Sequence, residues 1–102
     1  MVFKIQENNA QKALISLEGE LDTAASQDFA AKLQPFVADS AKEITFDFSK
    51  LEYISSSGMR AIMLLNKTAL ANGGKVFIKG MSEDIRQLFQ MTGFDQMMEI
   101  QN

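Results

Sequence analysis

The chain has 102 residues and a formal net charge of -3, and it contains no cysteine and no histidine. Disulfides, thiolate nucleophiles and metal sites built on these two residue types are therefore excluded, and the acidic balance argues against a nucleic-acid binder, which normally carries a basic stripe. Because no basic and apolar leader opens the chain and no apolar stretch approaches the ~20 residues that cross a bilayer, we expect one cytoplasmic domain, residues 1–102, with no cofactor, no direct nucleic-acid partner and no membrane insertion.

Two strands are predicted at the start of the chain. Residues 2–6 and 12–18 are typical of strands, and the polar, turn-prone segment 7–11 between them indicates a hairpin. Gly19 is expected to end the second strand.

A helix is predicted next. Asp22 and Thr23 offer its start, because their side-chain oxygens can accept hydrogen bonds from unpaired backbone N–H groups. Pro35 has no N–H and is expected to kink or end this helix. The apolar stripe at helical spacing consists of Ala25, Phe29, Leu33 and Phe36.

The second half of the chain continues the alternation of strands and helices. Such an order implies parallel strands joined by crossovers, and the opening hairpin adds an antiparallel edge. We therefore expect an α/β fold with a mixed sheet of four to five strands and helices packed mainly on one face. The predicted elements are a strand with Ile44, Phe46 and Phe48 facing inward, a helix over 59–71 stopped by Asn72-Gly73-Gly74, a strand over 75–79, a helix capped by Ser82 and ended by Gly93, and a possible last strand over 97–100.

The junction between the third strand and the second helix carries three serines and a glycine, Ser55-Ser56-Ser57-Gly58. Serines at a helix start can cap the helix or accept a phosphate. A phosphate is locally favourable there because the helix start presents unpaired N–H groups and partial positive charge, and Arg60 follows Ser56 at a spacing where helical neighbours meet. A serine nucleophile would need a base, and without histidine no enzyme is expected.

Four segments, in order along the chain, resemble the STAS domain, which occurs in sulfate transporters and in bacterial anti-sigma-factor antagonists. They are the Gly19-Glu20-Leu21-Asp22 segment, the run from Phe46 to Arg60, the Gly73-Gly74 pair, and the run from Leu88 to Phe94. The resemblance implies a STAS-like sheet with helices mainly on one face.

The chain looks most like a stand-alone anti-sigma-factor antagonist. Such a protein binds an anti-sigma factor that is also a serine kinase, which frees a sigma factor. The kinase ends the interaction by phosphorylating the antagonist, and a PP2C-type phosphatase restores it. Ser56 matches the phosphorylated serine, Ser57 is the less favoured acceptor, and Ser57 is then expected to cap the helix. The partner-binding residues implied are Asp22, Thr23, Ser55, Ser57, Gly58, Met59 and Arg60.

The sequence leaves several alternatives open. Ser55 stands where the family usually has an aspartate. Asp22 can be a helix cap or a partner contact, and Met59 is expected to pack in the core even though it lies beside the contact residues. The alternative function is a constitutive STAS accessory subunit, such as one that steadies an ABC-transporter ATPase.

Overall fold

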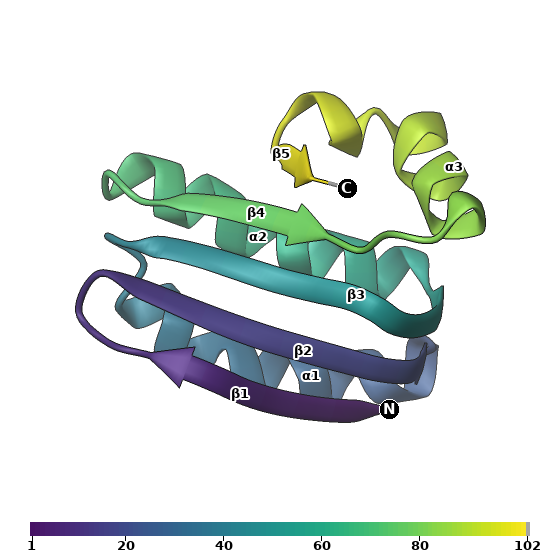
Figure 1. Ribbon diagram of the computed structural model, residues 1–102, viewed down its shortest axis with the longest axis horizontal. Coiled ribbons are helices and arrows are strands. Elements are labelled where there is room, and N and C mark those ends of the chain that lie inside the picture. The colour runs from purple at the N-terminus through teal and green to yellow at the C-terminus, as the bar shows by residue number, and fades with distance from the viewer. Residues whose placement is uncertain (102) are drawn as a thin grey trace.

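The computed structural model describes residues 1–101, which form a five-stranded mixed sheet with three α-helices (Figure 1). The strands lie in the order β1-β2-β3-β4-β5; β1 pairs antiparallel with β2, and the other pairs are parallel. This arrangement confirms the expected fold class. The elements are β1 (Val2–Asn8), β2 (Lys12–Leu21), α1 (Thr23–Ala38), β3 (Glu43–Ile54), α2 (Ser56–Ala71), β4 (Lys75–Lys79), α3 (Glu83–Thr92), the 3-10 helix η1 (Phe94–Gln96) and β5 (Glu99–Gln101).

Helices α1 and α2 cover the same face of the sheet, α1 behind β1 and β2 and α2 behind β3 and β4 (Figure 1). The inward residues of β3 fit this placement, since Ile44, Phe46 and Phe48 are all buried. The alternating residues Thr45 and Asp47 point to the other face and are half-buried. The period of two in the sequence therefore identifies the covered face of the sheet correctly.

The core contains a continuous series of phenylalanine rings that crosses the sheet. Neighbouring rings lie 6.1 to 6.5 Å apart between centroids, mostly edge to face, the arrangement that aromatic pairs prefer. The series links β1 and α1 at one side of the molecule to α3 and η1 at the other. Its members, in order of contact, are Phe3, Phe29, Phe46, Phe48, Phe89 and Phe94.

Strand β2 and helix α1 both continue past the residue at which the sequence suggested an end. Strand β2 does not end at Gly19 but continues to Leu21, and Gly19 adopts a positive φ of 87° beside an irregularity in the β2–β3 register. Glycine takes this conformation without steric cost, so the strand bends and continues. Pro35 lies inside α1, which continues to Ala38, and Phe36 beside it is buried.

Candidate functional site

The candidate site lies where β2 and β3 end side by side. Leu21 and Ile54 are paired in the parallel register, and the Ser55 amide donates to the Leu21 carbonyl at 2.7 Å. Each strand then feeds a helix, so Asp22 and Ser55 are the N-caps of neighbouring helices α1 and α2. The loops that follow β2 and β3 therefore lie at the same end of the sheet.

Ser55 caps α2. Its hydroxyl oxygen accepts from the Gly58 amide at 3.1 Å, and its carbonyl accepts the first intrahelical bond, from the Met59 amide. The expected cap at Ser57 was wrong because α2 begins at Ser56, ahead of the apolar pattern from which the helix was predicted. Ser55 is thus a buried helix cap.

Gly58 allows the start of α2 to pack directly on the strand ends. A Cβ atom added there would lie 2.9 Å from Leu21 Cδ2 and Cγ and 3.1 Å from Ile54 Cγ1. Because these side chains are themselves fully buried, they have little room to move. Glycine at this position therefore sets the distance between the helix start and the sheet.

Ser56 is exposed at the first position of α2. The guanidinium of Arg60 donates from Nη2 to Ser56 Oγ at 3.4 Å, which confirms the contact expected from the spacing of four residues. The amides of Ser56 and Ser57 precede the first intrahelical hydrogen bond, so they point out of the helix start. An anion on Ser56 would meet these N–H groups, the positive end of the helix dipole and a guanidinium.

The other predicted contact residues divide into exposed and buried groups. Asp22 and Thr23 are exposed beside residues 55–57, here called the serine loop, and Asp22 Oδ1 accepts from the Ala25 amide at 2.8 Å, which confirms its role as a cap. Gly58 and Met59 are buried along with Ser55, and Ser57 is half-buried. The buried residues thus shape the surface, while the exposed ones present groups that a partner can reach.

Sequence reasoning missed a groove next to the serine loop. Arg60, Met63, Leu64 and Lys67 line it from α2, and Phe94 lines it from η1. The available signal was the helical spacing of Arg60, Leu64 and Lys67, which places one apolar side chain between two cations on a single face. Phe94 could not be assigned in the same way, because only the folded chain brings η1 against α2.

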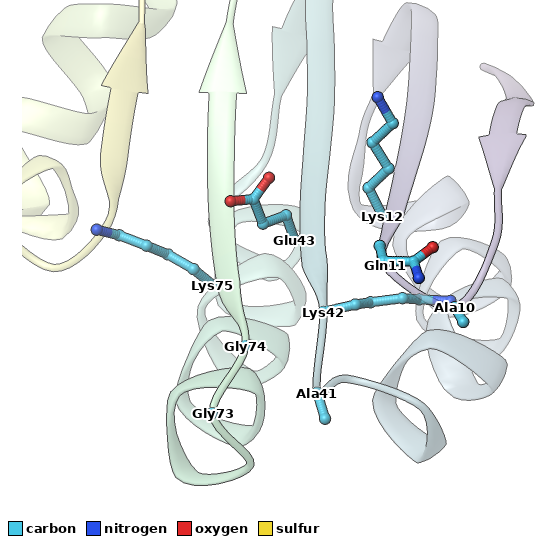
Figure 2. A pocket seen from close by; sticks show the side chains of 9 residues that line it. All are labelled: Ala10, Gln11, Lys12, Ala41, Lys42, Glu43, Gly73, Gly74 and Lys75. Carbon is cyan, nitrogen blue, oxygen red and sulfur yellow. The ribbon is translucent and has the colours of Figure 1, made fainter.

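A second hollow, of about 640 Å³, lies at the opposite end of the sheet, where β3 and β4 begin (Figure 2). The Lys42 side chain beside it is only 3% exposed, and Figure 2 shows it extending toward Ala10. Its ammonium donates to Asn8 Oδ1 at 2.7 Å and to the Asn9 carbonyl and Asp39 Oδ2, both at 3.2 Å. These bonds use its three donors, so Lys42 ties the β1–β2 turn to the start of β3.

The carboxyl of Asp47 lies on the face of β3 that no helix covers. Partial burial alone would raise its pKa, but the hydrogen bonds from Ser49 and the charges of Lys79 and Lys50 outweigh burial, and the pKa lies below the ordinary value of 3.8. The Ser49 amide donates to Asp47 Oδ1 at 2.9 Å. The charged form of the Asp47 carboxyl is therefore the one that the surrounding groups favour, and it holds the Ser49 amide.

No group of three or more acidic, histidine or cysteine side chains within residues 1–101 is placed to hold a metal ion. Over the same residues, no helix is long and apolar enough to cross a membrane.

The family model of the STAS domain matches residues 2–102. The chain belongs to the STAS domain family. It is 27% identical over 78 residues to BtrV of Bordetella bronchiseptica, a candidate anti-sigma factor antagonist, with 76% of this chain and 67% of that protein covered. It is 26% identical over 86 residues to the anti-sigma-B factor antagonist of Staphylococcus aureus strain NCTC 8325, with 84% of this chain and 80% of that protein covered.

The fold is also that of SpoIIAA, an anti-sigma factor antagonist. Its unphosphorylated form matches with a TM-score of 0.77 at 22% identity, covering 99% of this chain and 88% of that one. The phosphorylated form of the Bacillus protein matches with a TM-score of 0.75 at 25% identity, covering 97% and 90%.

Proposed function

We propose that this protein is a cytoplasmic anti-sigma-factor antagonist of one STAS domain, residues 1–102, whose binding to an anti-sigma factor with serine-kinase activity is ended by phosphorylation of Ser56. The observation that carries the proposal is the exposed Ser56 hydroxyl at the start of α2, beside the Arg60 guanidinium. Similarity to antagonists from two bacteria supports the partner class. A PP2C-type phosphatase would reverse the modification.

The chemistry of the switch belongs to the kinase. The γ-phosphoryl group moves from ATP to Ser56 Oγ, ADP leaves, and the hydroxyl proton passes to a base of the kinase. The antagonist contributes an acceptor held on a rigid helix start and performs no catalysis of its own. Ser56 is the preferred acceptor over Ser57 because it is exposed, whereas Ser57 is half-buried.

The phosphate would end binding without unfolding the domain. It adds about two negative charges at a helix start, where the dipole and the free amides stabilise them locally. The same charges lie on the surface formed with Asp22 and Thr23, so a docked partner would have to desolvate them next to an existing carboxylate. The phosphorylated SpoIIAA structure, which matches this fold, supports a folded phosphorylated state.

The test uses purified serine-kinase anti-sigma factors encoded in the same genome, with ATP and mass-spectrometric mapping of the phosphate. Phosphate is expected on Ser56, none on the Ser56→Ala variant, and normal labelling on the matched control Ser57→Ala. Unphosphorylated protein and Ser56→Ala should bind the kinase, and Ser56→Asp should bind poorly. If Ser56→Ala is still labelled and Ser57→Ala is not, the acceptor is Ser57. Absence of any kinase binding would contradict the proposal and favour the accessory-subunit function.

A further inference from the structure

The groove between α2 and η1 encloses about 360 Å³ and has an apolar floor with a charged rim. Met63 is buried and Phe94 is half-buried, while Leu64 is 61% exposed above them. A leucine that remains so exposed on a helix otherwise packed against the sheet makes no contribution to the core. It does offer apolar surface to a second molecule.

The two cations on the rim are not matched by the protein's own acids. Neither Arg60 nor Lys67 forms an ion pair within residues 1–101, and none of the groove's lining residues is acidic. This contrasts with the net charge of -3 of the whole chain and with the lysines elsewhere that do form ion pairs, which are Lys4, Lys12, Lys32, Lys42 and Lys75.

The groove is continuous with the serine loop. Ser56, Arg60, Leu64 and Lys67 follow one another at spacings of four, four and three residues, which places them along one face of α2. Arg60 belongs to both regions, since it lines the groove and donates to Ser56 Oγ at 3.4 Å. Arg60 therefore connects Ser56 to the groove.

We propose that this groove binds an acidic, amphipathic segment of the serine-kinase partner, an inference that rests on the proposed function. Phosphate on Ser56 would weaken this contact by drawing the Arg60 guanidinium to itself. The segment would place an apolar side chain beside Leu64 and carboxylates against Arg60 and Lys67. Charge complementarity selects an acidic occupant, and apolar surface between the cations selects an amphipathic one. Phosphorylation then both adds negative charge and removes one of the two attractive cations from the contact.

The first experiment measures the affinity of each purified serine-kinase anti-sigma factor of the same genome for unphosphorylated variants. Leu64→Gln is expected to weaken binding about tenfold, as truncation of a central interface contact does, and Lys67→Glu is expected to weaken it further at low salt. The matched control is Leu70→Gln. Leu70 is 51% exposed on the same helix but does not line the groove, so binding should stay within about twofold of the wild type.

The second experiment isolates Arg60. Phosphoserine is installed at position 56, or at position 57 as the control, and the Arg60 Nε–Hε signal is followed by NMR without any partner. A shift is expected for phosphoserine 56 alone. In Arg60→Ala, binding of the unphosphorylated protein should be weaker, and phosphorylation should reduce it by a smaller factor than in the wild type, which is the non-additivity expected of a shared contact.

The outcomes separate the two proposals. If the kinase binds and labels Ser56 but Leu64→Gln and Leu70→Gln bind it equally, the groove assignment is wrong and the proposed function stands. If no kinase binds the wild type, both fail. If phosphatidylglycerol vesicles bind in a manner that depends on Lys67 while kinase affinity does not, the groove belongs to a membrane surface and the inference is overturned.

Discussion

Ser55 and Leu21 are joined by a backbone hydrogen bond of 2.7 Å that links the end of β3 to the end of β2. Asp22, the residue after Leu21, caps α1, and Ser55 itself caps α2. This bond therefore holds the starts of the two helices next to each other. The exposed Asp22 and Ser56 thereby share one surface, although 33 residues separate the two positions in the chain.

The capping role of Ser55 predicts a difference among the three serines. Ser55→Ala should lower the free energy of unfolding by about 1 kcal/mol, because the Gly58 amide loses its acceptor. Ser56→Ala and Ser57→Ala, measured by the same urea titration, should each change it by less than about 0.5 kcal/mol. A larger loss at Ser57 than at Ser55 would contradict the observed start of α2.

Gly58→Ala tests whether packing or helix propensity decides stability. Propensity alone would favour alanine by about 1 kcal/mol, but the added methyl group would lie 2.9 Å from Leu21 side-chain atoms. We expect the variant to be less stable by about 1–3 kcal/mol, as overpacked cores are. The control is the Leu21→Ala background, where the same methyl group has room and should cost less. An increase in stability in the wild-type background would show that the contact relaxes freely.

Asp22 combines a confirmed cap with a proposed contact, and two substitutions separate these roles. Asp22→Ala removes the acceptor for the Ala25 amide and should cost about 1 kcal/mol. Asp22→Asn keeps an acceptor and should retain near-normal stability, yet bind the kinase more weakly or be phosphorylated more slowly. If the asparagine variant binds and is labelled like the wild type, Asp22 is a cap alone.

Asp47 predicts a pH dependence of stability. Its pKa in the folded protein is lowered, so the ionised carboxyl stabilises the fold above its ordinary pKa of 3.8 and loses this effect as the pH falls through the lower folded value. Asp47→Asn should be less stable than the wild type at pH 7, and the two proteins should converge in acid. Urea titrations from pH 7 to about pH 2 measure the difference; curves that stay parallel throughout would rule out this contribution.

Local patterns predicted most of the fold but misplaced features that depend on contacts between distant segments. The inward face of β3 and the caps at Asp22 and Ser82 follow from spacing and side-chain chemistry alone, and all are confirmed. The cap of α2 was misassigned because three adjacent serines are equivalent in sequence. The bond from the Ser55 amide to the Leu21 carbonyl distinguishes Ser55 from the other two serines, since it fixes where β3 ends and therefore where the helix begins.

The groove is another feature that local sequence patterns predict only in part. Arg60, Leu64 and Lys67 are spaced as an exposed helical face, which the sequence does reveal. Their apolar floor includes Phe94, whose position depends on the turn at Gly93 and on ring contact with Phe89. One exposed leucine on a helix is ordinary, but Leu64 lines a groove together with Phe94 and so belongs to a larger apolar surface.

Because the phenylalanine series crosses the whole core, the domain does not divide into two separately packed halves. Each ring, from Phe3 at the first strand to Phe94 at η1, is packed against the next, so no half of the molecule can detach without opening a void in the other. The domain should thus open as one cooperative unit, with the slowest amide exchange in its central strands. A domain that opens only as a whole rarely populates partly folded forms, which are the forms that proteases cleave and that aggregate.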